Sequence, residues 1–105
     1  MYVAAPIGDS VVEGYVDLLA DDGSGGLVVL DYKTDTVRDD VAVKERTERY
    51  RLQAATYALA IEAVTGMPVT RASFLFLGSS GAIEASVEDL ELAKAEARAV
   101  LDAAT

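Results

Sequence analysis

Three charged residues that directly follow an apolar run could carry chemistry. The run Leu27–Leu30 predicts a buried strand, and Asp31, Lys33 and Asp35 come immediately after it. Because successive side chains of a strand point to opposite faces, these three charges share one face. Charges near a core cost desolvation energy unless a partner compensates, so a metal ion with an anionic substrate would suit this place. A surface strand end beside a basic neighbour is the alternative interpretation.

A second acid is predicted to face the first across a hairpin. The Gly-rich loop Asp21–Gly26 would join a strand expected over Ser10–Ala20 to the strand that follows. If the hairpin is centred on Ser24, Asp17 lies opposite Asp31, with Cβ atoms about 4.5–5.5 Å apart. Two carboxylates at that distance repel each other unless a cation lies between them. A bulge in the loop would shift the register by one residue and break the pairing.

These groups together predict a metal-dependent hydrolytic site. Magnesium and similar hard cations take oxygen ligands, usually one or two carboxylates with water and substrate phosphate. Asp17 and Asp31 would supply the carboxylates, and the carbonyl of Tyr32 could supply a further oxygen. The metal ion would lower the pKa of a bound water and neutralise the phosphate in the transition state. Lys33 could orient that water or stabilise developing negative charge.

A long helix is expected beside the strand. Its pattern runs from about Lys44 to Thr65, with Gln53 and Tyr57 four residues apart on one face. A Gln that faces the sheet could hydrogen-bond a phosphate or a nucleophilic water, although a satisfied buried amide is the alternative. The first turns also hold the only basic cluster of the chain, which as a solvated face needs no function. Its members are Lys44, Arg46, Arg49 and Arg51.

Caps and turns divide the rest of the chain. Asp39 and Asp40 can cap the long helix, while Gly66 stops it and Pro68 prevents its continuation. Ser86 would be the N-cap of a last helix with Leu90, Ala93, Ala97, Val100 and Leu101 on one side. That helix ends near Ala103. Further strands are expected at Met1–Ala5, Thr70–Leu77 and Ala82–Ala85, with turns at Pro6–Asp9 and Gly78–Gly81.

Composition limits the function classes. The 105 residues predict a single domain, and a net charge of −9 argues against binding of nucleic acid by the whole surface. The chain has neither cysteine nor histidine, so any chemistry must use carboxylates, Lys, Tyr, Ser or Thr. The absence of cysteine fits a reducing cytoplasm. No apolar run is long enough to span a bilayer, so no membrane partner is expected.

Three motifs in this order resemble the RecB-like branch of the PD-(D/E)XK nuclease superfamily. They are Gly14-Tyr15-Val16-Asp17, Leu30-Asp31-Tyr32-Lys33-Thr34-Asp35, and Tyr50 followed by Gln53-Ala54-Ala55-Thr56-Tyr57. Order, spacing and flanking residues match over roughly Val3 to Leu77. The likeness looks closest to the C-terminal nuclease domains fused to UvrD-like helicases in bacterial break-processing enzymes.

The resemblance implies a fold, an activity and roles for residues. The fold would be α/β, a restriction-endonuclease-like mixed central sheet flanked by helices. The activity would be that of a DNA exonuclease in double-strand break processing and recombinational repair, using Mg²⁺ or Mn²⁺. DNA and the helicase portion would be its partners, and ATP would bind only the helicase. The implied metal ligands are Asp17, Asp31 and the Tyr32 carbonyl, with Lys33 as the catalytic lysine and Gln53 and Tyr57 lining the site.

One departure from the family pattern affects the expected activity. Many relatives place a metal-binding His or Glu on a helix upstream, whereas this sequence has no His and begins almost at the first strand. We therefore expect residues 1–105 to be a domain fragment truncated at its N-terminus, with weak or no nuclease activity by itself. Apolar sheet surface exposed by the lost helix could make it self-associate.

Two alternatives remain open. The chain could be a catalytically inactive nuclease-like scaffold, although the intact set of Asp17, Asp31 and Lys33 argues against that. It could also be a small acidic protein-interaction module. That interpretation explains the charge but does not explain three charges on one face of a buried strand.

Overall fold

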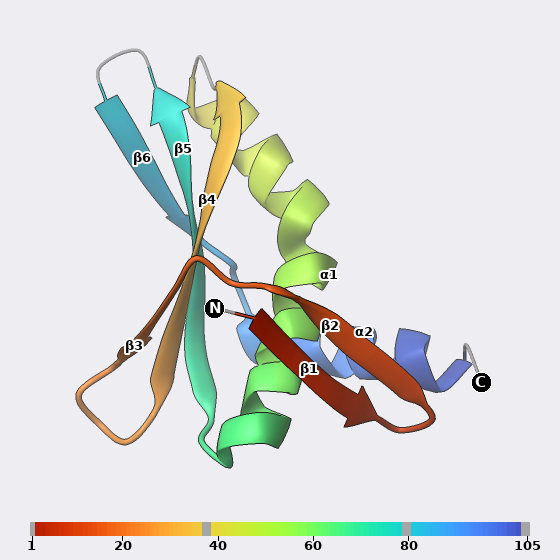
Figure 1. Cartoon of the computed structure of the whole chain (residues 1–105). Coiled ribbons are helices and arrows are strands. Elements are labelled where there is room, and N and C mark those ends of the chain that lie inside the picture. The colour runs from red at the N-terminus through yellow and green to blue at the C-terminus, as the bar shows by residue number, and fades with distance from the viewer. Residues whose placement is uncertain (1, 37–38, 79–80, 104–105) are drawn as a thin grey trace.

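The described residues of the computed structural model form six strands and two helices (Figure 1). The structure describes residues 2–36, 39–78 and 81–103, except for the side chains of residues 34–36. Predicted features at Met1, at residues 79–80 of the second turn and at the side chain of Asp35 lie outside this description. The elements are β1 (Tyr2–Ile7), β2 (Ser10–Tyr15), β3 (Leu18–Asp21), β4 (Leu27–Thr36), α1 (Asp40–Thr65), β5 (Val69–Gly78), β6 (Gly81–Ser86) and α2 (Leu90–Ala103).

A mixed four-stranded sheet carries the fold. Its order is β3-β4-β5-β6, with β4 and β5 parallel and the two outer pairs antiparallel. Parallel neighbours need a crossover connection, which α1 provides between β4 and β5. This arrangement confirms the expected α/β class with a mixed central sheet and flanking helices. β5 and β6 agree with the predicted strands to within one residue at each end.

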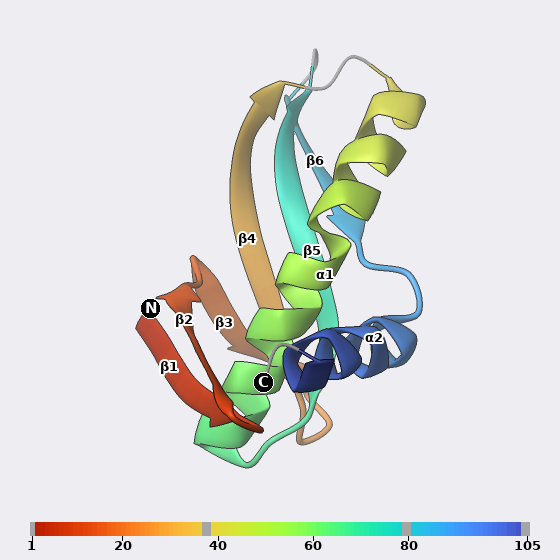
Figure 2. The same cartoon turned by 90° about the vertical axis from the view of Figure 1, so that its right-hand side faces the viewer.

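The hydrophobic core lies between this sheet and α1. Both helices and the β1–β2 hairpin lie on one side of the sheet (Figures 1 and 2). Phe74 and Phe76 of β5 are buried in one cluster with Ala55, Ala58 and Ile61 of α1. Small alanines on the helix let it approach the sheet closely, so the two aromatic rings fill the space between them. Among the described residues, neither helix has both the length and the hydropathy needed to cross a membrane.

The opposite face of the sheet carries apolar side chains that the described residues leave half-exposed. Leu18 of β3, Tyr32 of β4 and Leu77 of β5 have exposed fractions of 45%, 55% and 56%. They alternate with residues that point to the core, which assigns them to the outer face. This is an apolar sheet surface of the kind at which we expect self-association, and that association stays a prediction.

The predicted strand over residues 10–20 is wrong in one respect, because the chain bends at Val16 and Asp17. β2 pairs with β1 in a separate two-stranded sheet, whereas β3 pairs with β4. Val16 is buried in the core with 2% exposure, and the carboxylate of Asp17 accepts a hydrogen bond from the backbone of β4. In an unbroken strand Val16 and Leu18 would point to the same face, but the bend leaves Val16 buried and Leu18 45% exposed.

The turn before this strand is shorter than predicted. β1 continues through Pro6 and Ile7, and Ile7 pairs with Ser10. Ile7 has only 4% exposure, so its burial favours extending the strand. Gly8 and Asp9 alone form the hairpin loop, and Gly8 has a φ of 61°, a value that glycine adopts without steric cost.

Helix α1 begins four residues before the predicted start at Lys44. Asp39 is its N-cap, and its carboxylate accepts the backbone N–H of Ala42 at 2.8 Å. This confirms the capping role of Asp39, while Asp40 is the first helical residue. Because the cap satisfies an early N–H group, the four residues before Lys44 join the helix. Gly66 ends it as predicted, with a φ of 70° and its N–H on the carbonyl of Glu62.

Helix α2 begins at Leu90, so the prediction that Ser86 caps it is wrong. Ser86 ends β6, where its hydroxyl shares a hydrogen bond of 2.9 Å with the hydroxyl of Ser73 on β5. Leu90, Ala93 and Ala97 are buried as predicted. Val100 is not in the buried set, since 59% of it is exposed.

Lys94 fastens α2 to the rest of the fold. Its side chain is buried, and Nζ donates to Glu62 of α1 at 2.8 Å and to Glu91 at 2.6 Å. A third bond of 2.7 Å reaches the carbonyl of Val69 at the start of β5. A buried ammonium is stable only when its donors are satisfied, and this one has three acceptors.

Candidate active site

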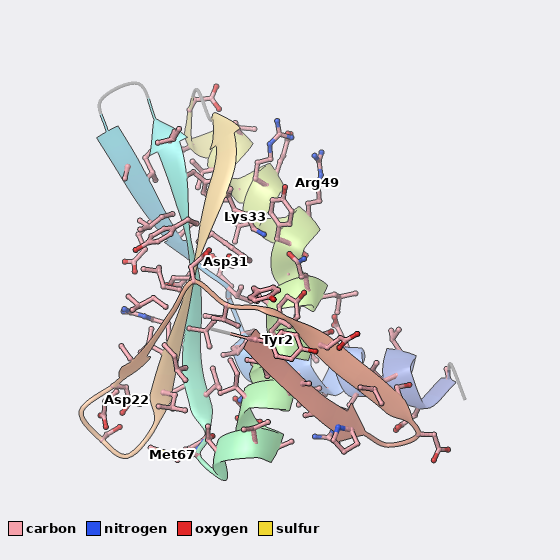
Figure 3. All side chains as sticks on the ribbon, viewed as in Figure 1. Tyr2, Asp22, Asp31, Lys33, Arg49 and Met67 are labelled. Atoms are coloured by element: carbon pink, nitrogen blue, oxygen red, sulfur yellow. The ribbon has the colours of Figure 1, made fainter. Side chains whose placement is uncertain are left out.

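β4 presents an acid and a base toward α1. Asp31 and Lys33 lie on the core side of the strand, and Lys33 reaches from β4 toward the helix (Figure 3). Their side chains form an ion pair with 2.9 Å between Nζ and Oδ2. The Lys33 side chain is 14% exposed and that of Asp31 23%, so the pair is partly shielded from water. The two charges therefore share one face, as the alternation of a strand predicts.

Lys33 is held by groups from three elements. Besides Asp31, its ammonium donates to the amide oxygen Oε1 of Gln53 on α1 at 3.1 Å. It lies 4.1 Å from the centre of the Tyr50 ring and 5.5 Å from that of Phe74 on β5. Gln53 thus lies on the side of α1 that faces β4, and the partner of its amide oxygen is the lysine itself. Because Oε1 faces Lys33, the amide nitrogen of Gln53 points away from that cation.

Asp17 reaches the same place from the bend before β3. Its Oδ2 accepts the backbone N–H of Tyr32 at 2.7 Å. The register of the β3–β4 hairpin, with Leu18 opposite Leu30, is the predicted one without a bulge. The ladder stops there, one position before the two acids, so Asp17 is not a paired strand residue. Its side chain nevertheless lies in contact with that of Asp31.

The contact gives the two carboxyl groups opposite pKa shifts. Burial and the contact with Asp17 raise the pKa of Asp31, although Lys33 acts against them. The pKa of Asp17 is lowered by the contact with Asp31 and by the N–H of Tyr32. Two carboxyl groups in contact repel each other when both are ionised, and a cation bound between them would relieve that repulsion.

The donor set fits a hard divalent cation. Two carboxylates in contact supply the negative charge, and backbone carbonyls are also accepted ligands for such ions. The N–H of Tyr32 points to Asp17, and the N–H and C=O of one strand residue point to the same side. The Tyr32 carbonyl thus lies on the side of Asp17. No group of three acids gathers in the part of the chain that the structure describes, so further ligands would be water or substrate.

Tyr57 lies beneath the site rather than among its charges. A Cβ atom at Gly14 would be 2.6 Å from ring atom Cε1 of Tyr57, so the ring packs directly on the glycine backbone. Tyr57 and Asp31 both line a cavity of about 10 Å³. One contact therefore links the glycine of the first motif to the tyrosine of the third.

Tyr50 is a residue of the site that was not predicted as one. Its ring lies next to the ammonium of Lys33, on the helix face that also carries Gln53. The available signal was its spacing, because Tyr50 precedes Gln53 by three residues and Tyr57 by seven on one helix face. Phe74 gave no such signal, since its place depends on the pairing of β4 with β5.

Part of the basic cluster of α1 serves packing. Arg51 forms an ion pair with Glu96 of α2, which favours a structural role for this member. Arg49 is exposed one turn before Gln53 (Figure 3). A pocket of about 410 Å³ lies between the first half of α1 and β6, with Val43 and Ile83 in its lining. Neither Asp17 nor Asp31 lines it, so it is separate from the candidate site.

Known proteins with similar sequences are helicase/nuclease subunits. The chain is 38% identical over 72 residues to an ATP-dependent helicase/nuclease subunit of Thermoanaerobacter sp. (strain X514), which is 69% of this chain and 6% of that protein. It is 30% identical over 84 residues to the helicase/nuclease subunit of the same name from Listeria welshimeri serovar 6b, which is 75% of this chain and 7% of that protein. The chain thus spans only 6–7% of the length of these curated relatives.

Structural and family comparisons extend over nearly the whole chain. The crystal structure of SSO0001 superposes with a TM-score of 0.52 and 17% identity, covering 95% of this chain and 47% of that one, which supports the fold. The family model for the PD-(D/E)XK nuclease superfamily matches residues 3–105. That range contains the bend, the acid-and-lysine strand and the helix with its glutamine. By the extent of this match, the chain belongs to the PD-(D/E)XK nuclease superfamily.

Proposed function

We propose that this chain hydrolyses DNA phosphodiester bonds with Mg²⁺ or Mn²⁺, as the nuclease domain of a bacterial helicase-nuclease. The observation that carries the proposal is the contact of Asp17 with Asp31 beside the ammonium of Lys33. Two acids and a lysine suit a reaction in which a metal ion and a phosphate meet. Family membership and the names of the relatives support the same class of reaction.

Asp17, Asp31 and the carbonyl of Tyr32 would hold the metal ion. When bound, the ion would lower the pKa of a water molecule and offset the negative charge of the phosphate. One carboxylate comes from the bend before β3 and the other from β4, so the bend and the β3–β4 register together set their separation. The site would therefore depend on the hydrogen bond that fixes the bend to β4.

Lys33 would stabilise the charge that develops on the phosphate. An ammonium has three N–H donors, and its polar contacts with Asp31 and Gln53 use two of them. Its third N–H can donate to a phosphate oxygen or to the attacking water. A preorganised donor of this kind is worth several kcal/mol, of the order of 3, when it acts on transition-state charge.

Gln53 would contact the substrate with its amide nitrogen. Its oxygen accepts from Lys33, which orients the amide. The N–H₂ group then points away from the lysine, and Gln53 is exposed, so this group can donate to a neighbouring phosphate. An exposed amide that is fixed on one side suits substrate contact better than core packing.

The wider role rests on the relatives. Their names describe an ATP-dependent helicase joined to a nuclease, so we propose that helicase domains use ATP and deliver DNA to this site. The net charge of −9 supports such a division, because the chain offers little general attraction for DNA. Double-strand break processing and recombinational repair are the processes in which such an enzyme would act.

Metal binding by the 105-residue chain tests the proposal. We would titrate Mn²⁺ by calorimetry into the wild-type chain, into Asp31→Asn and into Asp9→Asn, where Asp9 is an exposed acid of the β1–β2 loop. The wild type and Asp9→Asn should bind one ion, while Asp31→Asn should bind at least about 10-fold more weakly. Equal binding by wild type and Asp31→Asn would overturn the proposed site.

Cleavage is the second readout. We would incubate linear single-stranded DNA with excess protein and Mn²⁺, and include Lys33→Met as a variant that removes the ammonium and keeps most of the apolar stem. Slow, Mn²⁺-dependent cleavage that Lys33→Met loses is the expected result. Binding of Mn²⁺ without any cleavage would favour the inactive scaffold instead. Rapid multiple turnover would refute the prediction that the chain is weak by itself.

A further inference from the structure

An aromatic surface lies next to the ammonium of Lys33. The Nζ atom is 4.1 Å from the centre of the Tyr50 ring and 5.5 Å from that of Phe74. A cation within about 6 Å of a ring centre is attracted by the negative face of the ring. Both rings are inside that limit, so Lys33 has an aromatic contact in addition to its two polar ones.

This aromatic surface is anchored in the core. The rings of Tyr50 and Phe74 are 5.7 Å apart and tilted by 50°, and Phe74 lies 6.0 Å from Phe76. Phe74 has 1% exposure and Phe76 none. A ring that packs on fixed rings keeps its own position, so Tyr50 can hold a mobile group in place.

The ion pair with Asp31 is not enough to hold Lys33 in place when a metal ion is bound. A lysine side chain has four flexible carbons, and holding it in one geometry costs conformational entropy. Asp31 holds it now, but Asp31 is also a proposed metal ligand, and a second cation would share that carboxylate. The ring of Tyr50 binds no metal ion. Its attraction for the ammonium would therefore persist when the contact with Asp31 weakens.

We infer that Tyr50 is a positioning residue, whose ring keeps the ammonium of Lys33 at the site. The geometric part of this inference stands on the distances alone. Its catalytic part rests on the proposed function. Tyr50 does not need to touch the substrate in this role, because it acts through the position of Lys33. The ring, and not the hydroxyl, carries the effect.

Nuclear magnetic resonance tests the geometric part without any nuclease assay. Lys33 is one of three lysines, with Lys44 and Lys94, so its ε-methylene signals can be assigned from few candidates. A ring this close shifts those proton signals upfield relative to the exposed Lys44. Tyr50→Phe should retain the shift and Tyr50→Leu should lose it. Leu90→Ala, which removes a buried side chain of α2, should retain it and serves as the control for general loosening.

Single-turnover cleavage with excess protein and Mn²⁺ tests the catalytic part. We expect Tyr50→Phe to cleave within about 3-fold of wild type, and Tyr50→Leu to cleave roughly 5- to 30-fold more slowly. Mn²⁺ affinity should stay within about 2-fold in both variants, because neither change touches the carboxylates.

The outcomes separate this inference from the proposed function. Retention of the upfield shift in Tyr50→Leu would overturn the inference, whatever the activity. Loss of the shift together with wild-type cleavage would overturn the positioning role and leave the proposed function intact. Absence of cleavage in every protein, with the shift lost only in Tyr50→Leu, would count against the proposed function while the aromatic contact stands.

Discussion

The carboxylate of Asp17 accepts the backbone N–H of Tyr32 at 2.7 Å, which ties the bend between β2 and β3 to the strand that carries Asp31 and Lys33. Tyr32 lies between those two residues in β4. Asp17 thus comes directly before the first pair of the β3–β4 ladder and places a second carboxylate beside the first. The proposed metal site depends on this hydrogen bond, because its loss would let the two acids separate.

Two substitutions of Asp17 distinguish the contribution of its hydrogen bond from that of its negative charge. Asp17→Asn keeps an oxygen that can accept the N–H of Tyr32, whereas Asp17→Ala removes it. We expect the free energy of unfolding of Asp17→Ala to be about 1 kcal/mol lower than that of Asp17→Asn, as measured by urea titration followed by circular dichroism. Both should lose tight Mn²⁺ binding. Equal stability of the two variants would show that the hydrogen bond does not fix the bend.

The raised pKa of Asp31 predicts that ionisation of this residue lowers the stability of the fold. Since the folded chain holds this proton more tightly than the unfolded chain, the stability contribution of Asp31 is greatest below its ordinary value of 3.8 and is lost as pH rises through the folded pKa. Without metal, Asp31→Asn should therefore be more stable than wild type at pH 7. Urea titrations should show the difference shrinking as pH falls through the folded pKa of Asp31 and vanishing below about pH 4. A wild type more stable than Asp31→Asn at pH 7 would contradict this account.

Gly14 is predicted to tolerate no side chain. In Gly14→Ala the new Cβ would lie 2.6 Å from the Tyr57 ring, so the ring or the strand must move. Overpacking of this kind costs about 1–3 kcal/mol of unfolding free energy, measurable in urea. The double variant Gly14→Ala with Tyr57→Leu should recover part of the loss. No recovery would show that the strain lies elsewhere.

Lys94 should make the stability of the fold depend on pH in the alkaline range. Burial alone would lower its pKa, but Glu62 and Glu91 outweigh burial and raise the pKa above its ordinary value. Its stabilising contribution is present below about pH 10.5 and is lost as pH rises through the folded pKa. Lys94→Met, which keeps most of the apolar stem, should cost about 1–3 kcal/mol at pH 7, discounted because Glu91 is largely exposed.

Lys94→Met should also lack the fall in stability at alkaline pH that we expect of the wild type. Arg98→Met, which removes an exposed cation from the same helix, is the control and should change stability by less than about 0.5 kcal/mol. A wild type whose stability does not fall above about pH 10.5 would show that Lys94 contributes nothing through its charge.

Local patterns were enough to predict the register at the site. The symmetry of the loop around Ser24 set Leu18 opposite Leu30, and the alternation of β4 placed Asp31 and Lys33 on one face. The helix periodicity set Gln53 toward the sheet, where it accepts from Lys33. These features depend on neighbours in the sequence, and such neighbours are visible there.

The features that the sequence did not reveal depend on distant partners. Apolar alternation continues through Val16 and Asp17, so nothing local marks the bend that pairing with β1 and β4 produces. Ser86 has the signature of a cap, yet its hydroxyl bonds Ser73 of the neighbouring strand. Lys94 looks like a solvated lysine until Glu62 and Val69 surround it.

The most direct test is a crystal of the chain soaked in Mn²⁺ and measured at the manganese absorption edge. We predict one anomalous peak between Asp17 and Asp31, within coordination distance of an oxygen from each and of the Tyr32 carbonyl. A matched Asp31→Asn crystal should lack the peak. Ordered manganese elsewhere, with the two carboxylates left without a shared ion, would contradict the central claim that these acids form a metal site.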